Sequence, residues 1–584
     1  MNSKPESNPN DVAASLSYND VLLTDSVLKS KLRTIGEYYL SIPTADVFFE
    51  MRKHVGLDTG AGKSIVRGRS WFGVGGIVLG QWMQAFARFF RATQDERYRQ
   101  RCAEYVGQLQ EVSAVSPDCY ICRTAYQAEK IFHGLMDAAE YCGIEDAFSL
   151  CGRLLDHFRS IPAIRRAKCR IGDNGGSKDE TSCEIEWYTI SEALYRFADM
   201  AGRRRAKRDY VEELLRFARK FEYEAYWKIF AGGENMFDYS PVAGQNTAYF
   251  HAYSHLNSFN SAMYLYRKTG EKRYLESAER FMRFIRDTQT LVTGGYGALN
   301  EWLMPTTGII YALRNNHTNF ENQCNSYACF RLNNALTVAT GKLEYGDLTE
   351  LLYYNSFLAS PETDKDGHVY YYADYCVDGG KKWLHPISWT CCSGTRPLAA
   401  LEVLRNIYFT GKDGEILVNL YIGSSYRGRC ATIEQRGEYP VGDMTFRIIP
   451  HAGHRGERQV VRLRKPAWLA GAAEFTGADA SEEADAYTVE LTLDKEREFS
   501  VRFPMRVDAL DIRSCGEGVR AFRYGPLALA AEGENLGKEA PAAADFKRTG
   551  AAEFTAEGLT FRSFAAYELD EAYTMYFNIG EEQR

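Results

Sequence analysis

Three cysteines and one glutamate between residues 301 and 395 are the side chains of this sequence best suited to chemistry. Cys391 and Cys392 are adjacent in WTCCSGT, Cys324 lies in FENQCNSY, and Glu301 follows the glycine-rich stretch GGYGALN. Three thiols and a carboxylate can bind zinc tetrahedrally, and a thiolate held in this way is also a nucleophile. Because the chain has 14 cysteines, three buried structural thiols are the alternative explanation. The spacing alone leaves both interpretations open.

Several other polar residues are candidates with ordinary alternatives. Glu301 could act as a general acid or base, or be a solvated surface group. His251 and His255 are spaced i, i+4 in FHAYSHLNSF and share one helix face, which favours a substrate-facing helix end, although core histidines are the alternative. Glu184 and Glu186 begin another helical segment; we expect one to face a cavity and the other to favour the helix N-terminus by its charge.

Composition excludes some classes of partner. The chain of 584 residues has a net charge of −7 with no basic block, so we expect no nucleic-acid partner. No stretch of 18 apolar residues and no apolar signal segment occur, so we expect no membrane span and no export. The sequence thus predicts a cytoplasmic protein with reduced thiols. It does not set the oligomeric state, and a homodimer is one option.

The chain divides by texture into three parts. Residues 1–25 form a polar tail and an extended lead-in segment, residues 26–410 have helical periodicity, and residues 411–584 have short alternating runs typical of a β-sandwich. Within the helical part, a turn between two amphipathic helices recurs as TQDERY (93–98), CGIEDAF (142–148), MAGRRRAKRDY (200–210), TGEKRY (269–274) and TGKLEY (340–345).

Repeated helical hairpins form either an open solenoid or a closed α/α toroid. The loops at 171–183 and 289–320 are long for a simple array and resemble active-site loops gathered on one face. We therefore predict a closed (α/α)6 barrel followed by the β-sandwich.

Several motifs resemble glycoside hydrolase family 127, formerly DUF1680, whose type activity is β-L-arabinofuranosidase. The resemblance spans about residues 35–535. It rests on FENQCNSYACFRL, WTCCSGT, ILVNLYI, LGQWMQAFAR, YFHAYSHLNSFNSAMYLYRKTG, GGYGALNE, LRKPAW and FRYGPLALAAE. It implies an (α/α)6 barrel with β-sandwich material, and retaining hydrolysis by a cysteine near a zinc ion bound by one Glu and three Cys.

The resemblance also implies roles for individual residues. Cys391 matches the nucleophile, Glu301 the general acid/base, and Cys324 and Cys392 the other thiolate ligands of Zn²⁺. His251 matches a substrate-contacting histidine and Tyr371 a cavity tyrosine. Further candidate substrate contacts are His255, Glu184 and Trp389; Trp389 lies two positions before the thiol pair.

This sequence departs from the family at two positions. The usual Glu-x-Cys ligand pair appears as Asn322-Gln323-Cys324, with Glu321 one place too early, and one residue turns a helical side chain by about 100°. Glu321 and Asn322 are therefore candidates either for ligands or for helix-capping groups. Zinc is then held by three thiolates with Asn322 or water, held by a rearranged Glu321, or absent. Glu129 stands where the family has a histidine.

Together these features predict a retaining glycosidase that removes a terminal pentofuranoside or related sugar from small oligosaccharides. Two alternatives remain open: a catalytically decayed carbohydrate-binding or scaffold protein, and a hydrolase or lyase for uronic-acid sugars on the same toroid. The sequence leaves the sugar and its linkage undetermined.

Overall fold

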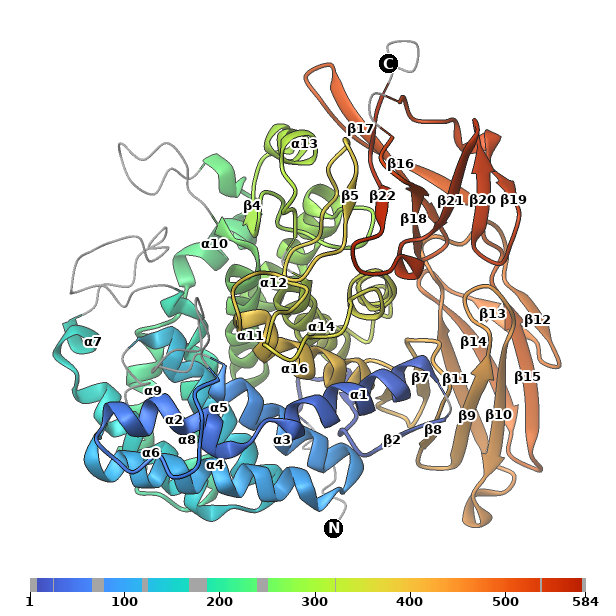
Figure 1. Ribbon diagram of the computed structural model, residues 1–584. Coiled ribbons are helices and arrows are strands. Elements are labelled where there is room, and N and C mark those ends of the chain that lie inside the picture. The colour runs from blue at the N-terminus through green and yellow to red at the C-terminus, as the bar shows by residue number, and fades with distance from the viewer. Residues whose placement is uncertain are drawn as a thin grey trace.

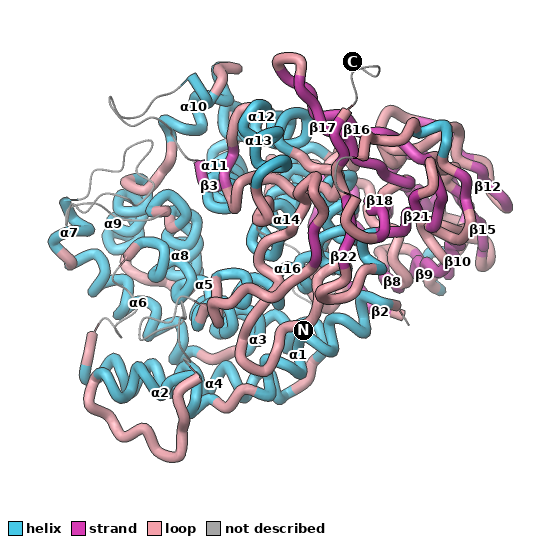
Figure 2. Tube along the Cα trace, turned by 45° about the horizontal axis from the view of Figure 1, so that its top comes forward, coloured by secondary structure: helices cyan, strands magenta, loops and turns pink. Residues whose placement is uncertain are grey.

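The computed structural model separates a helical part from a part made of sheets (Figures 1 and 2). It describes residues 8–24, 26–65, 78–117, 124–166, 186–238, 250–320, 322–535 and 538–579. Glu184, predicted to contact substrate, and Glu321, predicted as a metal ligand, lie outside these residues.

In the described part of the chain, six helices form an inner ring. Each packs on the next, and the last packs on the first, which closes the ring. The open solenoid is therefore excluded and the toroid confirmed. The inner helices are α3 (Leu79–Thr93), α5 (Ala125–Cys142), α8 (Ser191–Arg203), α11 (Ala252–Thr269), α14 (Asn322–Thr340) and α16 (Cys391–Arg405).

An outer helix packs on each inner one. These are α4 (Glu96–Val115), α6 (Glu145–Ser160), α9 (Arg208–Arg219), α12 (Lys272–Phe284), α15 (Gly346–Leu352) and α1 (Val27–Ser41). The five turn motifs of the sequence are the five inner-to-outer turns. In the first, Gln94 ends α3 in the left-handed conformation (φ 59°), and the Asp95 carboxylate accepts a hydrogen bond from the Arg97 N–H to cap α4.

The sixth pair joins distant parts of the chain, because α1 packs on α16. The other five pairs run from the inner helix to the outer one, and the first turns of α14 and α16 meet, so the inner helices are parallel and their N-terminal ends lie at one end of the ring. The segments that precede them, where the functional candidates lie, are gathered at that end.

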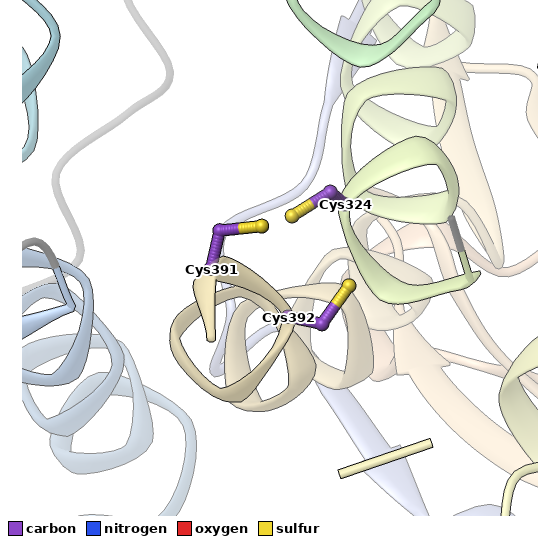
Figure 3. Close-up of side chains that lie close together, drawn as sticks. All are labelled: Cys324, Cys391 and Cys392. Carbon is purple, nitrogen blue, oxygen red and sulfur yellow. The ribbon is translucent and has the colours of Figure 1, made fainter. Parts of the chain in front are cut away.

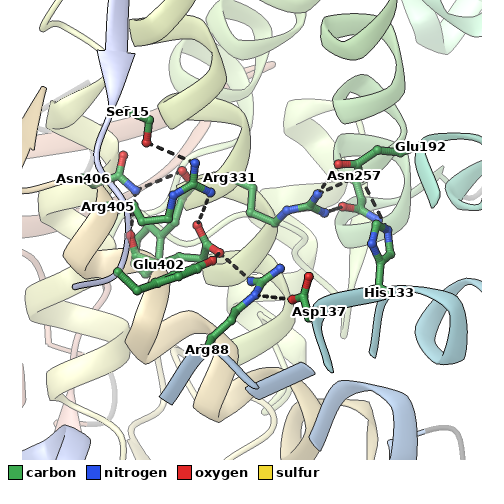
Figure 4. A network of polar contacts seen from close by, with 12 residues as sticks. Ser15, Arg88, His133, Asp137, Glu192, Asn257, Arg331, Glu402, Arg405 and Asn406 are labelled. Carbon is green, nitrogen blue, oxygen red and sulfur yellow. Dashed lines mark hydrogen bonds and ion pairs between the residues drawn. The ribbon is translucent and has the colours of Figure 1, made fainter. Parts of the chain in front are cut away.

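Ion pairs fill the interior of the ring deeper along the helices (Figure 4). Arg88 of α3 donates to Asp137 of α5 (2.8 Å) and to Glu402 of α16 (2.6 Å). Arg331 of α14 donates to Glu192 of α8 (2.5 Å). All five side chains are largely withdrawn from solvent, so the ring is a packed barrel and not a pore.

Two sheets of six described strands form the sandwich. One runs β1 (Ala13–Ser15), β6 (Tyr408–Gly411), β7 (Ile416–Val418), β11 (Arg458–Arg464), β14 (Ala486–Thr492), β13 (Ala480–Glu482); the other runs β12 (Glu474–Thr476), β15 (Arg497–Arg502), β10 (Met444–Pro450), β9 (Ala431–Gly437), β8 (Ser424–Arg427), β2 (Val21–Leu23). Alternate residues of β9 and β10 are buried, and the rings of Phe475 (β12) and Tyr487 (β14) meet between the sheets at 5.4 Å.

The structure divides the chain differently from the prediction in two respects. The lead-in segment contributes β1 and β2, which pair with β6 and β8, so it belongs to the sandwich. From Val507 on, the chain forms a third sheet around β16 (Val507–Ser514), β17 (Glu517–Tyr524) and β18 (Leu527–Glu532), which packs beside α13 (Thr306–Asn315). None of the described helices is both long and apolar enough to cross a membrane.

Candidate active site

The three predicted thiols meet where two inner helices begin (Figure 3). Cys324 lies in the first turn of α14, and Cys391 and Cys392 are the first two residues of α16. Their sulfur atoms all lie within 4.8 Å of one another and the residues are at most 5% exposed. Sulfur ligands of one tetrahedral zinc ion are about 3.8 Å apart, so the three thiols could hold one metal ion.

Helix geometry makes this position suitable for thiolates. The positive dipole ends of α14 and α16 lie at the three thiols, since all three belong to the first turns of these helices, and this favours negative charge there. Cys324 Sγ also lies 3.1 Å from the Thr395 hydroxyl, one turn into α16. The two helices pack on each other directly, so the ring itself holds the thiols together.

Asn322, the other predicted ligand, is engaged elsewhere. Its amide nitrogen donates to the carbonyls of Phe320 (3.4 Å) and Tyr371 (3.3 Å), and its amide oxygen accepts from the Ser356 hydroxyl (3.4 Å). To bind a metal with the thiols, Asn322 would have to leave these partners. Its ligand role therefore stays a prediction, and the geometry gives it no support.

A line of contacts leads from the nucleophile candidate to the acid/base candidate. Cys391 Sγ lies 3.6 Å from the Tyr371 hydroxyl, which donates to Glu301 Oε2 at 3.0 Å. Tyr371 is almost fully buried, and the His385 ring lies 5.0 Å from it. Tyr371 thus connects the thiol and the carboxylate, and His385 is a site residue that the sequence analysis missed.

His251 joins Glu301 to a second carboxylate. Its Nε2 lies 3.3 Å from Glu301 and 3.4 Å from Glu186. Strand β3 (Phe250–His251) pairs with β4 (Trp302–Leu303), so His251 stands opposite Trp302, and the Ala252 N–H donates to the Glu301 carbonyl at 2.8 Å. The sequence leaves open which of Glu184 and Glu186 faces the cavity and offers Glu184 as a substrate contact; Glu184 lies outside the described residues, and the structure has Glu186 against His251.

The two carboxylates have opposite pKa shifts. Burial raises the pKa of Glu186 above its usual value, and the nearby Glu301 raises it further. Burial also opposes ionisation of Glu301, but the proximity of His251 and hydrogen bonds from His251 and Tyr371 outweigh it, so its pKa lies below the usual value. Adjacent carboxyl groups whose pKa values are shifted apart are typical of acid/base sites.

Backbone conformation fixes this geometry. Leu299 and Asn300, directly before Glu301, are both left-handed (φ 51° and 73°), as are Glu186 (φ 58°) and Trp389 (φ 54°). Left-handed residues other than glycine are strained and collect at functional sites. Gly297 (φ 91°) has no alternative, because a Cβ there would lie 2.9 Å from the Ala252 Cβ.

A buried cation, also missed from the sequence, lies beside the carboxylates. Lys130 pairs with Glu129, donates to the Tyr253 hydroxyl (3.1 Å) and lies 4.2 Å above the Tyr126 ring. Burial raises the pKa of Tyr126, and the nearby Glu186 and Cys391 raise it further. Glu129, noted as a departure from the family, is thus balanced by the next residue in the chain.

Two predicted substrate contacts lie in packed surroundings. His255 is fully buried, with ring nitrogens 3.1 Å from the Tyr188 hydroxyl and 3.3 Å from that of Tyr223, and burial lowers its pKa to about 3. This corresponds to the core-histidine alternative. Trp389 packs edge-on against Trp82 at 5.3 Å and donates from its indole N–H to the Ile65 carbonyl. These contacts hold Trp389 in place directly before the start of α16.

The family comparison agrees with this site. Residues 122–399 match the sequence model of the β-L-arabinofuranosidase GH127 catalytic domain. This region is a catalytic domain of glycoside hydrolase family 127. The matched region begins at α5 and ends within α16, and so includes the thiols, both carboxylates and His251. As a member of this family the protein is a glycoside hydrolase. No curated protein matches the sequence significantly.

Solved structures confirm the fold of this GH127 enzyme. A GH127 β-arabinofuranosidase superposes with a TM-score of 0.70 at 15% identity, over 98% of this chain and 99% of that one. A GH127 β-L-arabinofuranosidase from Geobacillus stearothermophilus T6 gives 0.66 at 15% identity, over 96% and 100%. A further glycoside hydrolase gives 0.66 at 14% identity, over 99% of each chain.

Proposed function

We propose that this enzyme is a retaining, β-L-arabinofuranosidase-like hydrolase in which Cys391 is the nucleophile and Glu301 the general acid/base. The observation that carries the proposal is the short line of contacts from Cys391 through Tyr371 to Glu301. A nucleophile and an acid/base group on either side of a glycosidic bond are what the two-step retaining reaction requires. The substrate class is a terminal pentofuranoside, or a related sugar, on a small oligosaccharide.

In the first step, the Cys391 thiolate attacks the anomeric carbon, the glycosidic C–O bond breaks, and protonated Glu301 gives its proton to the leaving oxygen. In the second step, Glu301 takes a proton from water, the water oxygen attacks the same carbon, and the C–S bond breaks. The thiolate and protonated Glu301 are thereby restored.

Glu186 has a supporting role in this scheme. The lowered pKa of Glu301 leaves it ionised before substrate binds, so it needs a proton source. Glu186, with its raised pKa, can pass a proton to His251 Nε2, and the same nitrogen can pass it on to Glu301, since both carboxylates lie within 3.4 Å of it. The two carboxylates together thus hold the proton that catalysis uses.

We propose that the metal is zinc, bound by Cys324, Cys391 and Cys392. When bound, it would keep the sulfurs as thiolates and orient Cys391. Elemental analysis of the purified protein is expected to give about one zinc per chain, reduced in Cys392→Ser. A zinc content well below one per chain in the wild type would contradict the assignment.

The test of the nucleophile is turnover of a panel of aryl furanosides and pyranosides, combined with intact-protein mass spectrometry after rapid acid quench. The wild type is expected to accumulate a glycosyl adduct that maps to Cys391, and Cys391→Ala to lose both adduct and turnover. Cys329→Ala is the matched control, because Cys329 is a buried thiol of α14 bonded to Asn333, outside the site. Turnover that survives in Cys391→Ala would refute the nucleophile.

One observation favours the second candidate, hydrolysis of uronic-acid sugars. Lys130 places a positive charge close to Glu186, where a substrate carboxylate could pair with it. Aryl uronides therefore belong in the panel. Preference for a uronide over the neutral sugars, lost in Lys130→Met, would support this candidate over the pentofuranoside.

A further inference from the structure

A large cavity lies between the helical ring and the sheets, away from the active site. It has a volume of about 1180 Å³. Its walls come from the segment after α12, from α15, from the loop that follows β11, and from β16 and β17; none of its lining residues is a thiol, carboxylate or histidine of the active site. Cavities of this size are large enough for a small-molecule ligand.

Almost every charged group on these walls is neutralised by the protein. The pairs are Arg286 with Asp287, Lys342 with Glu344, Lys465 with Glu482, Arg513 with Asp511, Asp347 with Arg464, and Asp485 with Arg462. Apart from Arg523, the lining therefore carries little net charge of its own.

Arg523 of β17 is the exception. Within the described residues, no ion pair or side-chain hydrogen bond engages its guanidinium, and its Nε is enclosed without a hydrogen-bond partner. Asp508 stands directly opposite it on β16, but the Asp508 carboxylate accepts from Arg506 instead (2.7 Å). Burial lowers the pKa of Arg523. A cation that is desolvated without a partner costs free energy that an anionic ligand would recover.

We propose that this cavity binds a small molecule bearing a carboxylate or phosphate group, with Arg523 as the anchor. The guanidinium fork suits two oxygens of either group. Leu291, Leu510 and Tyr576 supply apolar wall around it, and the paired carboxylates farther out can accept hydrogen bonds from ligand hydroxyls. An acidic sugar and free phosphate share the anchoring chemistry; a neutral sugar lacks it.

Calorimetric titration of the full-length protein tests this without measuring turnover. The probes are D-glucuronate, inorganic phosphate and, as the neutral probe, D-glucose. We expect at least one anion to bind with a millimolar or lower Kd, glucose not to bind, and Arg523→Met to weaken binding at least tenfold. Arg513→Met is the matched control, because it removes a paired arginine from the same cavity, and it should change the Kd less than threefold.

A second variant keeps Arg523 in place. Leu510 is the diagonal neighbour of Arg523 on the same sheet face, so Leu510→Glu places a carboxylate within its reach. It should abolish binding while the variant unfolds at a temperature near that of the wild type. If neither anion binds at concentrations up to about 20 mM, or if Arg523→Met binds them as tightly as the wild type, the proposal is overturned. Tighter glucuronate than phosphate binding would identify an acidic saccharide as the ligand class, and the reverse a phosphate.

Discussion

The active site and the ion-pair interior are built on the same inner helices and differ in how their charged groups are stabilised. In the interior, each cation meets a carboxylate: Arg88 lies between Asp137 and Glu402, and Arg331 faces Glu192. At the N-terminal ends of the helices, acidic groups cluster instead. Three thiols lie together, and two carboxylates share one histidine.

The difference follows from the direction of the helices. Parallel inner helices bring their positive dipole ends together at one end of the ring, which favours anions there and nowhere deeper. Deeper in the ring the helix dipoles do not stabilise an anion, so a buried charge needs a side-chain partner. Removing a charge from the site should therefore cost activity, whereas removing one from the interior should cost stability.

The largest effect is expected from Glu301→Gln. The loss of the general acid/base should lower kcat/KM by about 10²- to 10⁴-fold, because neither step can then transfer its proton. The free energy of unfolding should fall by no more than about 1 kcal/mol, because the amide loses the interactions with His251 that lower the Glu301 pKa but is less costly to bury than a carboxylate. Steady-state kinetics measures the loss of kcat/KM, and denaturant unfolding measures the change in stability. A decrease of several kcal/mol in the free energy of unfolding would contradict the division between site and interior.

Glu402→Gln tests the interior. It leaves Arg88 with one carboxylate partner fewer and replaces the charged acceptor of the Tyr18 hydroxyl with a neutral amide oxygen. Breaking a buried ion pair by removing one partner costs about 3–5 kcal/mol, so the unfolding midpoint in denaturant should fall markedly. The kcat of the protein that remains folded should stay near the wild-type value. A large fall in kcat with unchanged stability would show that the network serves catalysis.

Glu186→Gln should have a smaller effect on the reaction, about 10- to 100-fold in kcat/KM. The raised pKa of Glu186 keeps a proton available to higher pH than Glu301 could hold it alone. Without Glu186, the alkaline limb of the pH–rate profile should therefore move to lower pH. An unchanged profile with lowered kcat/KM would leave Glu186 only a structural role.

The smallest effect concerns Lys382, a buried cation that no carboxylate of the described residues pairs with. It donates to the Tyr567 carbonyl (2.8 Å) and lies 4.5 Å from the Phe564 ring. Burial lowers its pKa to about 7 from an ordinary value near 10.5. Between these values the unfolded chain binds more protons, so Lys382 should make the protein more stable as pH rises, by at most about 1.4 kcal/mol per pH unit.

Lys382→Met should remove this dependence. Unfolding free energies measured between pH 7 and 9 should rise less steeply in the variant than in the wild type. Lys381→Met is the matched control, because Lys381 is exposed and 3.8 Å from Asp570. Parallel curves for wild type and Lys382→Met would show that the lysine is solvated and charged in the folded state.

Local sequence patterns were sufficient to predict the helical hairpins and the adjacent pair of thiols. Helical periodicity and turns such as TQDERY mark the hairpins because capping and left-handed turn residues act within a few positions of the chain. Cys391 and Cys392 are likewise together because they are adjacent at a helix start, whereas Cys324 reaches them only because α14 packs on α16.

Tertiary structure decided what depends on contacts between distant segments. The sequence could not show that β1 and β2 join the sandwich or that α1 completes the last hairpin, because these pairings join residues hundreds of positions apart. It also favoured Glu184, whereas the ring places Glu186 against His251. Contacts between side chains from distant segments depend on the closure of the helical ring. This closure brings the thiols, Tyr371 and Glu301 into one site.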